Sequence, residues 1–109
     1  MGKKVKVASF GLNEDFLKGL RQDQVIPVIL EKVETVRGYQ PDLIVFPEAF
    51  MKIGGDRENP NWIALTQQML DSLCQKAREI GCYIVAPVYE PVKAYPNLKY
   101  NCTIVIDRK

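Results

Sequence analysis

Hydrophobic and polar residues alternate along the first part of the chain. Val5, Val7 and Ser9 share one side of this pattern over residues 4–10. A period of two is typical of a β-strand, because successive side chains of a strand point to opposite faces. We therefore predict a first strand over residues 4–10, followed by a loop over residues 11–21 that contains the turn residues Gly11, Asn13 and Gly19.

The next segment has helical spacing. Its apolar residues recur every three or four positions over residues 22–37, at Val25, Ile29, Val33 and Val36. We expect Asp23 to cap the start of this helix, Pro27 to fit only if it lies in the first turn, and Gly38 to end it. The apolar stripe should pack on a sheet.

A continuous apolar run follows at residues 43–46, between Pro41 and Pro47. Such a short run between helix breakers is typical of a buried strand in a parallel sheet. Proline has no backbone N–H, so Pro47 should end the strand. Glu48 comes next, just beyond the carboxyl end of the strand, where open α/β sheets bind ligands.

The second half of the chain again predicts a helix followed by a strand. Asn59 and Pro60 are a good helix start, and Gly81 is a good helix end. The apolar stripe of this helix comprises Ile63, Thr66, Leu70, Leu73, Ala77 and Ile80. Strands should follow at residues 83–88 and 100–107, joined by a loop without a helix, which favours an antiparallel return. The predicted fold class is α/β: a βαβαββ mixed sheet with both helices on one face.

Composition narrows the possible functions. The net charge of +2 is too small to predict a nucleic-acid surface, and no apolar stretch reaches the length that spans a bilayer, so no membrane contact is expected. The chain has no histidine, and its three cysteines, Cys74, Cys82 and Cys102, match no metal-site spacing. We predict no metal, no cofactor and a cytoplasmic location. The cysteines should be small buried hydrophobic residues.

Taken alone, Glu48 has two interpretations. It is either an ordinary loop or capping carboxylate, or a general base or acid whose pKa is tuned by apolar neighbours. Phe50 and Met51, in the irregular segment after it, either line a pocket or pack against the end of the strand.

The segment Pro-Asp-Leu-Ile-Val-Phe-Pro-Glu-Ala-Phe, residues 41–50, resembles the region around the catalytic glutamate of the nitrilase, or carbon–nitrogen hydrolase, superfamily. Residues 1–10, 83–90 and 100–107 are similar in kind and order to other strands of that family. The resemblance implies that residues 1–109 are the N-terminal part of such a domain, with Glu48 as the catalytic base. Phe50 and Met51 are candidate substrate contacts because of their place in the loop that follows Glu48. It also implies a small nitrile, amide, carbamoyl or ureido substrate.

That family uses a glutamate, a lysine and a cysteine nucleophile. Only the glutamate falls within this chain, because the family's lysine and cysteine lie further on. We therefore expect the 109-residue chain to be an inactive fragment by itself. None of its own cysteines lies at the sharp strand-to-helix turn that presents the family's nucleophile.

The family fold is a four-layer αββα sandwich, of which this chain resembles one half. The exposed apolar face of a half sandwich predicts self-association into a homo-oligomer. Two other functions remain open: a small non-catalytic α/β binding module, and a nucleotide-binding domain, which would lack the usual glycine-rich motifs.

Overall fold

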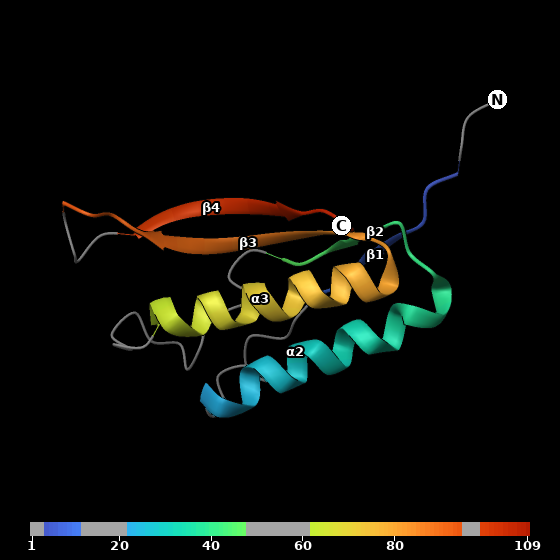
Figure 1. Ribbon diagram of the computed structural model, residues 1–109, viewed down its shortest axis with the longest axis horizontal. Helices are drawn as coiled ribbons and strands as arrows, with labels where there is room; N and C mark the ends of the chain where they lie inside the picture. The colour runs from blue at the N-terminus through green and yellow to red at the C-terminus, as the bar shows by residue number, and fades with distance from the viewer. Residues whose placement is uncertain (1–3, 12–21, 48–61, 95–98) are drawn as a thin grey trace.

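The computed structural model describes residues 4–11, 22–47, 62–94 and 99–109. Two strand–helix–strand units are followed by a final strand, in the order β1 (Val7–Ser9), α2 (Gln22–Val36), the 3-10 helix η1 (Arg37–Tyr39), β2 (Leu43–Val45), α3 (Trp62–Ile80), β3 (Tyr83–Pro91) and β4 (Lys99–Ile106). The sheet order is β1-β2-β3-β4, with β1, β2 and β3 parallel and β4 antiparallel to β3. The predicted fold class is confirmed (Figure 1).

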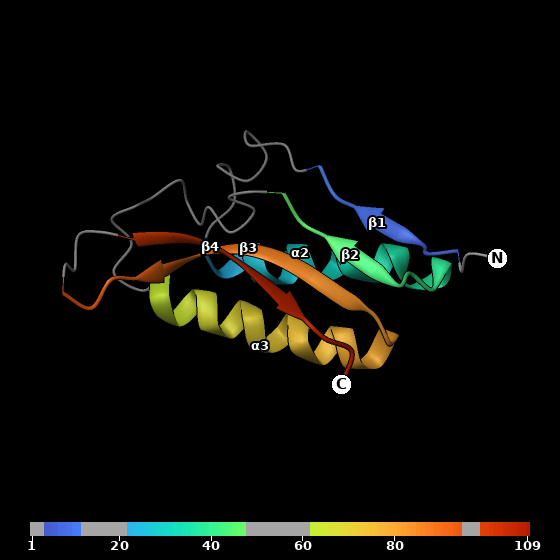
Figure 2. The same cartoon turned by 90° about the horizontal axis from the view of Figure 1, so that it is seen from above.

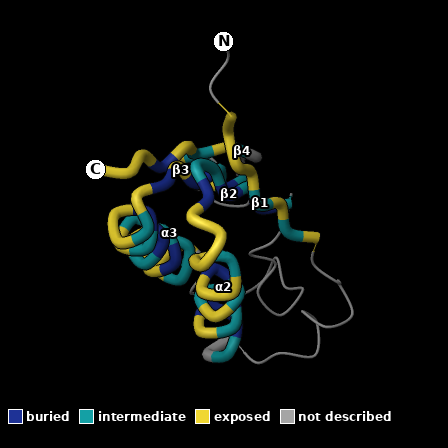
Figure 3. The backbone as a smooth tube through the Cα atoms, turned by 90° about the vertical axis from the view of Figure 1, so that its right-hand side faces the viewer, coloured by how far each residue is buried: buried dark blue, intermediate teal, exposed yellow. Residues whose placement is uncertain are grey.

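Both helices lie on the same face of the sheet, as the view from above and the view along the strands show (Figure 2, Figure 3). The core fills the space between the two layers. Ile29 and Val33 of α2, Leu73 of α3, and Ile44 and Ile84 of the central strands are completely buried. Burying each such side chain stabilises the fold by about 1.5–3 kcal/mol, so this single layer of contacts holds the helices to the sheet.

The apolar stripe of α2 is correctly predicted, but the ends of the helix are not. Asp23 lies inside α2 and does not precede it, and Pro27 is therefore beyond the first turn, where it is exposed. At the other end, Gly38 lies within η1, and Gln40 adopts the left-handed conformation with φ 50°. The N–H of Gln40 donates to the carbonyl of Arg37 over 2.9 Å, so the extra 3-10 turn moves the end of the helical segment two residues further.

Gly81 ends α3 as predicted. It has φ 76°, a conformation that glycine adopts without a steric penalty. The N–H groups of Gly81 and Cys82 both donate to the carbonyl of Ala77, over 2.8 and 3.0 Å. The predicted stripe is partly wrong: Ile63 is 49% exposed, whereas Met69 is completely buried. The buried face runs through Met69, Leu73 and Ala77 at four-residue spacing. The predicted start at Asn59 and Pro60 lies outside the described residues.

The strands differ in length from the predictions. β1 spans three residues because it pairs only with the three residues of β2. β3 is longer than predicted, at nine residues, and includes Pro87 and Pro91. The N–H of Tyr83 donates to Asp42, and the carbonyl of Val85 accepts from Phe46. The backbone N–H and C=O groups of the odd-numbered residues of β3 therefore point toward β2. Pro87 and Pro91 therefore lack only N–H groups that would point beyond the end of β2.

The face of the sheet opposite the helices carries no described helix or strand (Figure 3). In the strand register, Val7, Leu43 and Tyr83 form one row of side chains on this face. A second row comprises Ser9, Val45, Val85 and Val105. Val7 is 57% and Val105 64% exposed. We call these two rows the open face.

Candidate active-site edge of the sheet

The carboxyl ends of β1 and β2 meet at one edge of the sheet. The N–H of Phe10 donates to the carbonyl of Val45 over 3.0 Å, and the N–H of Phe46 donates to the carbonyl of Val85 over 3.0 Å. The hydrogen-bond ladder thus continues one residue past β1 and β2. This edge is where an open α/β sheet places its ligand site.

Two aromatic rings close the helix-facing side of this edge. The rings of Phe10 and Phe46 stack with their centroids 5.3 Å apart and their planes 22° apart. Phe46 is almost completely buried, and Phe10 is half-buried against the core. Such a pair adds about 0.5–1.5 kcal/mol beyond the burial of its area. The stack therefore holds Phe46, the residue directly after β2, in place.

The predicted site residues follow this stack in the sequence. Glu48 is separated from Phe46 by Pro47 alone, and Phe50 and Met51 come shortly afterwards. All three predicted site residues lie outside the described residues, so their roles remain predictions. What the structure describes is the strand end that leads to them: Phe46 is buried and hydrogen-bonded, and Pro47 is half-buried.

The β3–β4 hairpin extends past the same edge. The paired residues run from Ile84 with Ile106 to Pro91 with Lys99, whereas β2 pairs with β3 only as far as Val45 with Val85. Figure 1 shows the outer part of the hairpin reaching beyond the end of β2. The hairpin therefore extends beyond the carboxyl end of β2 on one side.

The three cysteines are free thiols. Cys82 is completely buried, as predicted, and Cys74 and Cys102 are half-buried. Burial raises the pKa of the Cys82 thiol. Burial and the neighbouring Glu90, through its negative charge and a hydrogen bond, raise the pKa of Cys102. The thiolate is the nucleophilic form, so Cys82 and Cys102 are poorly suited to be nucleophiles.

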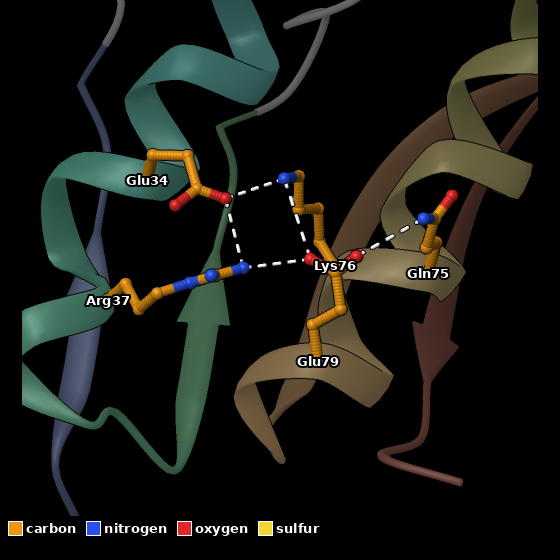
Figure 4. A network of polar contacts seen from close by, with 5 residues as sticks. All are labelled: Glu34, Arg37, Gln75, Lys76 and Glu79. Atoms are coloured by element: carbon orange, nitrogen blue, oxygen red, sulfur yellow. Dashed lines mark hydrogen bonds and ion pairs between the residues drawn. The ribbon is translucent and has the colours of Figure 1, made fainter.

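Four charged residues lie at the other end of the helical layer, near the last turns of α2 and α3 (Figure 4). Arg37 Nη2 is 3.0 Å from Glu34 Oε1 and 2.8 Å from Glu79 Oε2. Lys76 Nζ contacts the same two carboxylates. We call this the interhelix ion network. The ends of the helices adjoin the starts of the parallel strands, so the network joins the helices at the end away from the candidate site.

The start of the parallel strands has its own polar contacts. Asp42 Oδ2 accepts the backbone N–H of Lys6 over 2.9 Å. The N–H groups of Asp42 and Leu43 donate to the carbonyl of Lys6. These bonds set the register of β1 against β2, and with it the pairing of Phe10 and Phe46 at the far end.

The chain was compared with known proteins. The family model described as carbon–nitrogen hydrolase matches residues 6–109. The chain belongs to the carbon–nitrogen hydrolase family. The match includes all described strands and helices of this carbon–nitrogen hydrolase chain, together with Glu48. No curated protein matched it in a sequence search.

Among its described residues, the carbon–nitrogen hydrolase chain has no cluster of three or more potential metal ligands. Neither described helix is both long enough and apolar enough to cross a membrane. Phe10 lies at the candidate edge but was not predicted to do so from the sequence. Its signal was the register: extending the pairing of Ser9 with Val45 by one residue brings Phe10 beside Phe46.

Proposed function

We propose that this chain supplies the general base of an enzyme that hydrolyses a non-peptide C–N bond of nitrile or amide type. Glu48 is the base, and Phe50 and Met51 contact the substrate. The observation that carries the proposal is the family match over residues 6–109, combined with the position of Glu48 in the sequence, two residues after the buried Phe46. A carboxylate next to apolar residues has a raised pKa, which makes it a better base near neutral pH.

The proposed chemistry divides among three groups, as the family resemblance implies. The glutamate accepts the proton of a cysteine thiol, and the thiolate attacks the nitrile or amide carbon. With an amide, the C–N bond then breaks and the amine leaves with the proton that the glutamate returns. A lysine stabilises the charge that develops in the transition state, and water then releases the product from the covalent intermediate. Cys82 and Cys102 have raised pKa values, so neither of these two thiols is well suited to be that nucleophile.

The proposal is tested with the protein encoded by the complete reading frame. We expect it to release ammonia or the corresponding amine from a nitrile, an aliphatic amide, a carbamoyl compound or a ureido compound. The 109-residue chain should release none, because one member of a catalytic set retains little of the rate. A stop codon directly after Lys109, with no activity on this panel, would contradict the hydrolase and favour the non-catalytic binding module.

We further propose that the isolated chain forms a homodimer through the open face. Large exposed apolar patches are unusual on monomers. A two-fold contact places the same patch of both copies face to face, so like charges on it would repel. The two rows of the open face themselves contain no charged residue, and the described cation beside them, Arg108, lies over the Tyr83 ring, 5.5 Å from its centre. The face is therefore compatible with a second copy.

Light scattering after size-exclusion chromatography tests this dimer. We expect the 109-residue chain to have twice the monomer mass at micromolar concentration, and Val105→Lys to be monomeric with an unchanged circular dichroism spectrum. Ile63→Lys, at an exposed position on α3, is the matched control and should remain dimeric. A monodisperse wild-type monomer would contradict the dimer.

We propose a cytoplasmic location for the enzyme. The support is that the chain carries three cysteines, all of them free thiols. Free thiols persist in reducing compartments, whereas oxidising ones favour disulfides. Cell fractionation with an antibody to the chain tests this, and recovery outside the cytoplasmic fraction would contradict it.

A further inference from the structure

β4 is the last strand of the sheet, and no described strand pairs with its outer edge. The odd-numbered residues of β3 direct their backbone groups toward β2, so the even-numbered ones bond to β4. Each even-numbered residue of β3 lies opposite an even-numbered residue of β4, as Ala86 lies opposite Ile104. The N–H and C=O groups of the odd-numbered residues of β4, among them Asn101, Thr103 and Val105, therefore point outward.

The described part of this edge lacks the features that usually prevent strand pairing, which are prolines, charges and bulges. The register of β4 with β3 is unbroken along the strand, so it contains no bulge. Residues 100–106 include no proline, glycine or charged residue, and residues 103–106 are all β-branched. The prolines of the hairpin, Pro87 and Pro91, belong to β3 and affect only its β2 side. β4 therefore keeps every outward N–H group.

β4 is also complementary to an antiparallel copy of itself. A two-fold axis at Thr103 places outward-pointing residues opposite each other, with Thr103 facing Thr103 and Asn101 facing Val105. At the ends of this register, Lys99 of one copy lies opposite Asp107 of the other, so opposite charges meet. A displacement by one residue would set outward-pointing groups against inward-pointing ones, and a displacement by two residues would separate Lys99 from Asp107.

We propose that β4 is an interaction surface for a second copy of this chain, and that the two strands pair antiparallel about Thr103. The two-fold axis is then perpendicular to the sheet, so the two sheets join into one, with all helices on one side and both open faces on the other. This contact consists mainly of backbone hydrogen bonds, whose net contribution in water is small. We therefore expect it at higher concentration than the dimer through the open face, on which it does not depend.

Cross-linking tests the register. The variants are made in the 109-residue chain carrying Val7→Lys, which places a charge on the open face and removes the dimer proposed there. Under mild oxidation at millimolar concentration, Thr103→Cys should form a disulfide between two copies, because directly opposite hydrogen-bonded residues are about 5.5 Å apart at Cα, within the range of a disulfide. Asn101→Cys and Val105→Cys should cross-link with each other when mixed, and neither should pair with itself. Peptide mass spectrometry identifies each bond, and the absence of a bond through position 103 would overturn the register.

Light scattering tests the contact without cysteine chemistry. The Val7→Lys chain should have the monomer mass at micromolar concentration and twice that mass at millimolar concentration. Adding Thr103→Pro removes the central outward N–H and should leave a monomer at both concentrations. Thr103→Val, the matched control, keeps the N–H and the branched side chain and should still dimerise. A proline variant that dimerises like its parent would overturn the pairing through β4.

Hydrogen exchange of the Val7→Lys chain repeats the test without a proline substitution. The N–H groups of Asn101 and Thr103 should exchange at least about tenfold more slowly at millimolar than at micromolar concentration. The N–H of Ile104, which points to β3, should exchange at the same rate at both. A Val7→Lys chain that stays monomeric, with unchanged exchange, would overturn the β4 contact and leave the open-face dimer and the hydrolase unaffected. A wild-type monomer at micromolar concentration would instead overturn the open-face dimer alone.

Discussion

The N–H of Phe46, the residue directly after β2, donates to the carbonyl of Val85 over 3.0 Å, and the described pairing of β2 with β3 ends at Val85. Beyond it, β3 continues through Pro87 to Pro91 with β4 on its other side. Prolines are normally excluded from central strands. Here they are tolerated because an N–H at either position would point to the β2 side of β3, beyond the end of β2. The hydrogen bonds between β3 and β4 therefore lose no donor.

The position of these prolines gives a stability prediction. Pro87→Ala should change the free energy of unfolding by less than about 1 kcal/mol, because it removes no ladder bond. Ala86→Pro should cost about 3 kcal/mol or more, because the N–H of Ala86 points to β4 and the residue is buried. Urea denaturation of both variants measures this. Equal costs would show that the odd-numbered residues of β3 do not face β2.

The core between α2 and the sheet gives a second prediction. Ile29→Ala should destabilise the chain by about 2–5 kcal/mol, because a completely buried side chain leaves a cavity. Ile63→Ala is the matched control on α3. With its side chain 49% exposed, it should cost well under half as much. If the two variants lose the same free energy of unfolding, the buried face of the helices has been wrongly assigned.

The interhelix ion network predicts how stability depends on pH. Hydrogen bonds from Arg37 and then Gln75 lower the pKa of Glu79. Its stabilising contribution is therefore present above the unfolded pKa, about 4.3, and is lost as the pH falls through the lower folded pKa. The hydrogen bond to Glu34 raises the pKa of Lys76 above 10.5, so that contribution is present below the unfolded pKa and is lost as the pH rises through the folded value.

Glu79→Gln should accordingly lower the melting temperature at pH 7 in low salt, and less so in 1 M salt, because the charges are exposed and screened. Below about pH 3 the difference from wild type should disappear. Glu31→Gln changes an exposed carboxylate outside the network and is the control. A difference between Glu79→Gln and wild type that is the same at every pH would contradict the network.

The buried thiol gives a chemical prediction. Cys82 is completely buried and its pKa is raised, so a short pulse of iodoacetamide at pH 7.5 should leave it unmodified in the native chain. In denaturant it should react fully, and mass spectrometry of the peptides distinguishes these results. Cys74, which is half-buried on α3, should be modified sooner. Rapid native labelling of Cys82 would contradict the described end of α3.

The patterns that predicted correctly are those set by local geometry. Helical spacing placed Val25, Ile29 and Val33 in the core, and Gly81 ended α3 because the chain there needs a positive φ. Pro41 and Pro47 bracketed the buried strand. The alternation of residues along the strands, with both helices on one side of the sheet, also predicted the face that the helices leave uncovered, the open face.

The errors came from tertiary contacts that no local pattern encodes. Ile63 fits the helical stripe, but it lies in the first turn of α3, where its side chain is exposed. Met69, further along α3, is the first completely buried residue of the helix among those described. Pro91 belongs to β3 because β4 pairs with it, and Phe10 matters because the register brings it to Phe46. Glu48 was predicted from a family resemblance, and Phe50 and Met51 from their place in the loop after it. All three lie outside the described residues.

The central claim, that Glu48 is the base of a carbon–nitrogen hydrolase, is tested most directly by the kcat/KM of Glu48→Gln in the protein encoded by the complete reading frame, with Glu31→Gln as the control. We predict that Glu48→Gln loses about 10²–10⁴-fold in kcat/KM and keeps the wild-type melting temperature, while Glu31→Gln retains full activity. A Glu48→Gln enzyme with kcat/KM within about threefold of wild type would contradict the claim.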